Sequence, residues 1–135
     1  MIYKETRDFK TEDVRNLYDS NGWVSYVRNI DRTMQALEKA LYVYSAWDGE
    51  KLVGLIRSVG DGLTIFYIQD LLVDPNYQGK GIGTKLLEDT LKKFSDVYQI
   101  VLITDDKEKT VNFYKKVGLN SGKETGVITF TKMNY

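Results

Sequence analysis

A segment with three glycines at every second position, DPNYQGKGIGTK at residues 74–85, constrains the fold of this chain more than any other feature. It follows a mostly apolar run and precedes a segment with helical spacing of apolar residues. Because glycine lacks a Cβ and loses more backbone entropy on folding than any other residue, three of them in one turn indicate that the local geometry requires them. The segment therefore predicts a strand, a tight turn and a helix in succession.

A turn of this kind is suited to binding an anion. The first N–H groups of a helix have no partner within the helix and lie at the positive end of its dipole. Glycines let a phosphate approach the backbone, and Lys80 and Lys85 add positive charge. The alternative is a turn that binds nothing, for which one glycine normally suffices. The spacing fits neither a P-loop nor a dinucleotide fingerprint, since the latter needs glycine where Thr84 stands.

The composition limits the classes of partner. The chain has 135 residues, of which 42% are apolar and 28% charged, as expected of one globular domain spanning residues 1–135. With 19 basic and 19 acidic residues it has no net field to attract nucleic acid or an anionic membrane. No apolar run approaches the roughly 20 residues that span a bilayer, and the N-terminus lacks the apolar centre of a signal peptide. We expect a cytoplasmic protein that binds neither nucleic acid nor membrane.

The chain contains no cysteine and no histidine. This excludes disulfides, thiolate zinc sites, thiol nucleophiles and a histidine base. Any acid–base chemistry must therefore come from Asp, Glu, Tyr, Lys or water, and we expect no metal.

The order of elements predicts a mixed α/β fold, with a mostly antiparallel sheet flanked by helices. Turn signals at Asp48-Gly49 and Asp61-Gly62 predict two hairpins, and the crossover after the second should be right-handed. A slip in alternation at residues 69–72 indicates a β-bulge. The expected elements are a strand at 1–6, a helix capped by Thr11, a helix from Asp31 or Thr33, strands at 41–47, 51–59 and 64–73, a helix at 80–94, a strand at 98–104, a helix at 107–116 and a last antiparallel strand at 126–133.

Two motifs in this order resemble those of the GCN5-related N-acetyltransferases (the GNAT family). The acetyl-CoA motif of that family, Q/R-x-x-G-x-G/A, reads here Gln78, Gly79, Lys80, Gly81, Ile82, Gly83, and it follows a strand that ends Leu71, Leu72, Val73. A second signature, an aromatic-Tyr pair followed by Gly-Phe, stands as Phe113-Tyr114 and Gly118-Leu119. The element order agrees along nearly the whole chain, which implies the GNAT acyl-CoA N-acyltransferase fold.

The resemblance implies acetyl-CoA as cosubstrate. The amides from Gly79 to Thr84 would bind its pyrophosphate, and the strand edge at residues 71–73 would pair with the pantetheine arm, with one amide facing the acetyl carbonyl. Tyr114 falls at the tyrosine that protonates the departing thiolate, although its position alone also fits a core tyrosine. Lys107 departs from the family, which often has a coenzyme-contacting Asn there.

The implied reaction is direct attack by a primary amine on the thioester in a ternary complex. An alkylamine, with a pKa of about 10, must first lose a proton at pH 7. Asp70 is the candidate for this base or for binding the ammonium, with a solvated or bulge-capping residue as the alternative. Trp23 and Tyr26 are expected to line the site of a small-molecule amine, unless they are core anchors.

Two other functions remain open at this point. One is a coenzyme A-binding module or sensor without turnover, and the other is an acetyltransferase acting on protein amines. By analogy with the family, we expect a homodimer.

Overall fold

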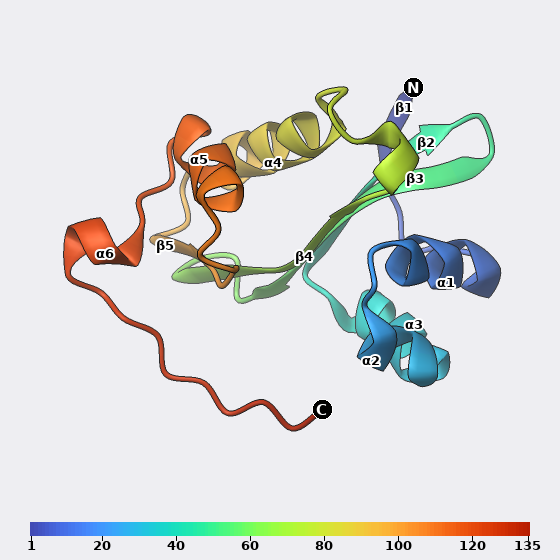
Figure 1. The fold of residues 1–135 in the computed structure, drawn as a ribbon, viewed down its shortest axis with the longest axis horizontal. Helices are drawn as coiled ribbons and strands as arrows, with labels where there is room; N and C mark the ends of the chain where they lie inside the picture. The colour runs from blue at the N-terminus through green and yellow to red at the C-terminus, as the bar shows by residue number, and fades with distance from the viewer.

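A five-stranded sheet in the order β1-β2-β3-β4-β5 organises the computed structural model, which describes all 135 residues (Figure 1). The first four strands are antiparallel, and β5 is parallel to β4. The strands are β1 (Ile2–Glu5), β2 (Tyr42–Asp48), β3 (Lys51–Gly60), β4 (Ile65–Val73) and β5 (Gln99–Leu102). The helices are α1 (Thr11–Ser20), α2 (Val24–Arg28), α3 (Ile30–Lys39), α4 (Ile82–Lys93), α5 (Glu108–Lys116) and α6 (Gly122–Thr125), with a 3-10 turn at Pro75–Tyr77. None of these helices combines the length and apolar character that crossing a membrane requires.

The predicted hairpin turns are confirmed. Gly49 connects β2 to β3 with a φ of 61°, which a residue with a side chain rarely adopts. Asp61 stabilises the turn before β4, because its Oδ1 accepts hydrogen bonds from the backbone N–H groups of Leu63, Thr64 and Ile65 at 2.8, 2.8 and 3.0 Å.

The first helices differ from the sequence prediction in two details. The N-cap of α1 is Lys10, whose side chain makes no capping bond, and Thr11 is already helical. The short helix α2 was not predicted. α3 begins at Ile30, one residue before the expected Asp31, because the side chain of Asn29 caps it by accepting from Arg32 N–H.

A β-bulge in β4 is confirmed at the predicted place. Arg57 pairs with Asp70, but the next residue of β3, Ser58, pairs with Ile68, so that Gln69 is an extra residue. One inserted residue exchanges the two faces of a strand. Ile68 accordingly packs in the core under α4, whereas Leu72 packs in the core formed with α1 and α3. The bulge thus turns Asp70 toward α1.

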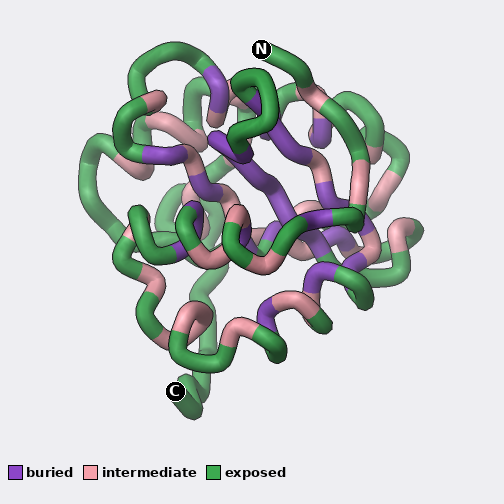
Figure 2. The backbone as a smooth tube through the Cα atoms, turned by 90° about the vertical axis from the view of Figure 1, so that its right-hand side faces the viewer, coloured by how far each residue is buried: buried purple, intermediate pink, exposed green.

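The helices divide between the two faces of the sheet, with α1–α3 on one and α4 and α5 on the other (Figure 1). Each face has its own core. The buried residues lie mainly along the central strands and the helix faces against them (Figure 2).

The last predicted strand is wrong. Residues 126–133 form no strand, and the chain instead makes the single turn α6 and continues as an irregular segment, residues 127–135, here called the tail. The alternation of the tail is real, but a strand needs an edge to pair with, and Gly126 (φ 75°) turns the chain away after α6.

Candidate functional site

The N-terminus of α4 presents a row of unpaired backbone donors. The first hydrogen bond of the helix runs from Lys85 N–H to Gly81 O at 3.0 Å. None of the six N–H groups from Gly79 to Thr84 donates to any oxygen of the chain. Gly79 and Gly81 have φ angles of 78° and 82°, so the turn depends on glycine at both positions. This is the geometry of an anion site at a helix end.

The surroundings of the turn leave it accessible. A Cβ at Gly79 or Gly81 would meet nothing within 4 Å, whereas one at Gly83 would lie 3.5 Å from the Val73 side chain. Gly83 therefore brings α4 close to the end of β4. Of the two lysines expected to add charge, Lys85 is paired with Asp89 at 3.0 Å and Lys80 lies over the Tyr77 ring.

Further positive charge lies beside the turn. A groove of about 730 Å³ runs between the N-terminus of α4 and α5. Its lining residues are Thr84, Lys109, Asn112, Phe113, Lys115 and Lys116.

The strands β4 and β5 separate before β4 reaches this turn. Their pairing ends at Ile68 and Leu102, so β4 has no partner on that edge from Gln69 onward. Asp74 N–H donates to Val53 O on β3 at 2.8 Å. Since successive residues of a strand direct their main-chain groups to opposite edges, Leu71 and Val73 face the free edge. Leu72 faces β3, and its side chain is buried in the α1–α3 core.

Tyr114 lies on α5, half-buried against the core under α4. Burial, and secondarily the charge of Asp105, raises the pKa of its hydroxyl. The hydroxyl has no hydrogen-bond partner in the chain, so it is a protonated group free to donate to a ligand. The packing of the Tyr114 ring is that expected of a core tyrosine, and its unpaired hydroxyl is compatible with a role as the general acid.

Asp70 is the centre of a buried polar cluster, and the alternative of a solvated residue is wrong because it is only 1% exposed. Its Oδ2 accepts from Arg57 Nε at 2.6 Å and from the Tyr18 hydroxyl at 2.8 Å. Its Oδ1 accepts from the Tyr26 hydroxyl at 3.2 Å, and that hydroxyl in turn accepts from Gln69 Nε2 at 3.2 Å.

The charges in this cluster support one another. Burial by itself would lower the pKa of Arg57. The charge and hydrogen bond of the Asp70 carboxylate raise this pKa by more, so the net shift of the Arg57 pKa is upward. Burial, followed by the charge of Asp70, raises the pKa values of Tyr18 and Tyr26. The two phenols therefore remain protonated donors, and Tyr26 connects the buried Asp70 to the part-buried end of the cluster.

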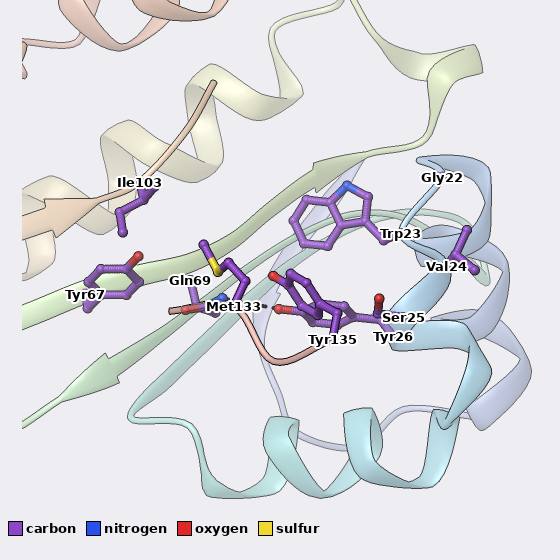
Figure 3. A pocket seen from close by; sticks show the side chains of 10 residues that line it. All are labelled: Gly22, Trp23, Val24, Ser25, Tyr26, Tyr67, Gln69, Ile103, Met133 and Tyr135. Atoms are coloured by element: carbon purple, nitrogen blue, oxygen red, sulfur yellow. Dashed lines mark hydrogen bonds between the residues drawn. The ribbon is translucent and has the colours of Figure 1, made fainter. Parts of the chain in front are cut away.

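A pocket of about 390 Å³ opens beside the point where β4 and β5 separate (Figure 3). Trp23 and Tyr26, both predicted for the acceptor site, line it, and they also pack against the α1–α3 core. The other lining residues are Gly22, Val24, Ser25, Tyr67, Gln69, Ile103, Met133 and Tyr135. No acidic or basic side chain is among them.

Sequence reasoning missed two members of the cluster. Arg57 is the one charged residue within the apolar run LVGLIRSV, and a charge in such a run is a signal for a buried ion pair. Tyr18 was assigned only to a helix face. The bulge that brings both to Asp70 is a property of the paired sheet.

Comparison with known proteins agrees with this architecture. A family model described as "Acetyltransferase (GNAT) domain" matches residues 5–135. Similar curated proteins include histone acetyltransferase TAP1 from Glycine max, 28% identical over 92% of this chain and 58% of that protein. An uncharacterized N-acetyltransferase ycf52-like from Prochlorococcus marinus is 28% identical over 87% of this chain and 66% of that protein. The chain thus spans less than two thirds of either relative.

Two solved structures are also similar. A GNAT-family acetyltransferase from Streptococcus pneumoniae TIGR4 is 38% identical, with a TM-score of 0.87 over 98% of this chain and 97% of that one. An aminoglycoside 6'-N-acetyltransferase complexed with coenzyme A is 20% identical, with a TM-score of 0.69 over 87% of this chain and 84% of that one. At that identity the second likeness concerns the fold alone.

Proposed function

Because the chain belongs to the GNAT acetyltransferase family, we propose that it transfers the acetyl group of acetyl-CoA to a primary amine of a small molecule, by direct attack in a ternary complex. The observation that carries the proposal is the row of six unpaired N–H groups at α4, beside the free edge of β4. The N–H groups would bind the diphosphate, and the free edge of β4 extends from them to the pocket lined by Tyr67 and Gln69.

The coenzyme is held mainly by main-chain atoms. The N–H groups from Gly79 to Thr84 bind the pyrophosphate, and the lysines of the neighbouring groove attract its other charges. The pantetheine arm pairs with the β4 edge through Leu71 and Val73, in the manner of an added strand. Leu72 lies between these two residues and directs its main-chain groups toward β3. At the end of the free edge, the Gln78 side chain donates to Val73 O at 3.1 Å.

In the chemical step the amine nitrogen attacks the thioester carbonyl and the C–S bond breaks. A free N–H of β4 stabilises the negative charge on the carbonyl oxygen. The Tyr114 hydroxyl gives its proton to the thiolate, which its raised pKa allows over a wide pH range. The attacking amine loses its proton to water. Asp70 is then a positioning residue, since it is buried and holds Tyr26 at the pocket wall.

The pocket favours an acceptor with a single cationic group and an apolar or aromatic body. The rings of Trp23, Tyr26 and Tyr67 offer apolar surface and cation–π contacts. A polycationic acceptor would need carboxylates around it, and none of the lining residues is acidic. The aminoglycoside specificity named for several structural relatives, the coenzyme A complex among them, therefore does not suit this pocket.

An amine panel tests the proposal. We expect calorimetry to detect acetyl-CoA binding, and thiol release to be faster with arylalkylamines than with polyamines or aminoglycosides. Tight binding of the coenzyme without thiol release for any amine would favour the sensor function, and release only with peptide amines would favour the protein-directed enzyme.

The role of Tyr114 is tested by Tyr114→Phe. We expect turnover to fall by about 10²-fold with coenzyme affinity nearly intact, because a general acid contributes on this order. Tyr98→Phe is the matched control, as Tyr98 is 85% exposed. Equal turnover in the two variants would remove Tyr114 from the mechanism.

A further inference from the structure

The side-chain amide of Gln69 uses only one of its two ends. Its Nε2 donates to the Tyr26 hydroxyl at 3.2 Å, drawn as a dashed line in Figure 3, whereas its Oε1 accepts no hydrogen bond from the chain. Gln69 is exposed and lines the pocket beside the separation of β4 and β5. It contributes the one carboxamide oxygen among the lining side chains. That oxygen is therefore an acceptor available to a ligand.

The β-bulge brings Gln69 to this position. Successive side chains of a regular strand point to opposite faces of the sheet. Gln69 and Asp70 are successive, yet both contact the Tyr26 hydroxyl, because Gln69 is the extra residue of the bulge in β4. Gln69 is also the first residue of β4 without a partner on β5, so its side chain lies at the start of the free edge.

The chemistry of the bonded groups fixes which end of the amide faces the pocket. The Asp70 carboxylate, paired with Arg57, can only accept hydrogen bonds. The Tyr26 hydroxyl has a single hydrogen and donates it to Asp70 Oδ1 at 3.2 Å. Burial, followed by the charge of Asp70, raises the pKa of Tyr26, so the hydroxyl keeps this hydrogen. The Tyr26 oxygen can then only accept from Gln69, and the NH2 end of an amide is the end that donates.

We propose that Gln69 binds the acceptor amine, with its Oε1 accepting an N–H of the amine in the amide orientation that the buried Asp70 imposes through Tyr26. This inference rests on the proposed function and specifies how its acceptor is held. A hydroxyl that donates to an anion becomes a better acceptor, and this polarisation passes along a chain of hydrogen bonds. The charge of Asp70 thereby strengthens Oε1 as an acceptor, although the carboxylate does not touch the amine. Asp70 and Tyr26 act as positioning residues.

The place of Gln69 suits the reaction. A strand advances by about 3.3 Å per residue, so Leu71, whose main chain faces the free edge, lies roughly 7 Å beyond Gln69. An amine held through one N–H at Gln69 directs its nitrogen lone pair along this edge toward the thioester carbonyl. After the C–N bond forms, the second hydrogen of the nitrogen leaves to water, and the first stays with Gln69 until the amide product departs.

Two substitutions separate the acceptor role from the bond to Tyr26. Gln69→Met keeps the length of the side chain and loses both ends of the amide, whereas Gln69→Glu keeps an acceptor oxygen and, when ionised, has no hydrogen for Tyr26. In thiol-release assays with an arylalkylamine, KM should rise about tenfold for Gln69→Met with kcat nearly unchanged, because the hydrogen bond is lost in ground and transition states alike. Gln69→Glu should stay close to the parent. Gln35→Met, on the exposed side of α3, is the matched control.

The outcomes distinguish this inference from the proposed function. Equal KM values for the parent and Gln69→Met would overturn the inference and leave the acetyltransferase reaction in place. Equal losses in Gln69→Met and Gln69→Glu would do the same, since Gln69 would then only hold Tyr26 in position. A parent that releases no thiol with any amine would refute the proposed function, and the inference would fall with it.

Inhibition by methylated amines tests the N–H bond without turnover. A dimethylated and a trimethylated arylalkylammonium carry the same charge and the same aromatic body at pH 7, but only the first has an N–H. The parent should bind the dimethylated compound about tenfold more tightly, as expected of one hydrogen bond, and Gln69→Met should lose this preference. A parent without the preference, or a variant that retains it, would contradict the proposal.

Discussion

Removal of the Asp70 carboxylate tests the physical account of the buried cluster. In Asp70→Ala the guanidinium of Arg57, with a side chain 9% exposed, loses the oxygen that lies 2.6 Å from its Nε. The buried hydroxyl of Tyr18 loses its acceptor as well. Breaking a buried ion pair from one side costs about 3–5 kcal/mol, which is a large part of the roughly 5–15 kcal/mol that stabilises a domain.

Urea denaturation followed by tryptophan fluorescence measures this loss. For an m-value of about 2 kcal/mol/M, the expected loss lowers the midpoint by about 2 M. Asp19→Ala, on the exposed side of α1, removes the same charge and should change the free energy of unfolding by less than about 0.5 kcal/mol.

A double variant separates charge from volume. Asp70→Leu with Arg57→Met removes both charges and should recover the part of the stability that the unpaired Arg57 charge costs in Asp70→Ala, although Tyr18 still lacks its acceptor. Because Tyr26 also loses its acceptor in this folded variant, a positioning role of Asp70 predicts a partial loss of turnover, whereas loss of a base would abolish it. A loss below about 1 kcal/mol for Asp70→Ala, or a double variant no more stable than the single one, would refute the reasoning.

Three further predictions concern the site and its supporting turns. Gly81→Ala places a side chain at φ 82° beside the donor row and should weaken coenzyme binding measured by calorimetry, while Gly126→Ala, with similar strain at φ 75° after α6 and outside both the pocket and the groove, should not. The Asp61→Ala variant should be less stable than the parent at pH 7, because hydrogen bonds from Leu63 above all lower the pKa of Asp61. The stabilisation by ionised Asp61 is fully present above the pKa of this residue in the unfolded chain, about 3.9, and is lost as the pH falls below that value. The urea midpoints of the two proteins should therefore converge in acid. Finally, because burial raises the pKa of Tyr114, kcat should show no alkaline loss due to this residue below about pH 10, and a Tyr114-dependent fall between pH 7 and 9 would contradict its role as the acid.

Much of the fold could be predicted because the signals are local. The turns at Gly49 and Asp61, the stripe of apolar residues on α4 and the glycines of its N-terminus each depend on neighbouring residues alone. The donor row could be predicted for the same reason, since the N–H groups of the first turn of any helix lack internal partners. The bulge could be predicted because the alternation of apolar and polar residues slips at residues 69–72.

Other features depend on residues distant in the sequence. The tail alternates as a strand does, yet alternation specifies only side-chain direction, and the tail pairs with no strand of the sheet. The burial of Asp70 could not be read from its neighbours in sequence, so the sequence left it a candidate for the base or for binding the ammonium. Tyr18 lies 52 residues away from it, and Arg57 lies 13 away on another strand.

The sequence by itself determined the glycine turn, the helix that follows it and hence the row of unpaired N–H groups, because backbone dihedrals and unpaired helix donors are set within a few residues. Only the tertiary structure decided which edge of β4 is free, on which face of the sheet the Asp70 side chain lies, and where the tail lies. These depend on strand register and on burial, and both arise from contacts between residues that are far apart along the chain.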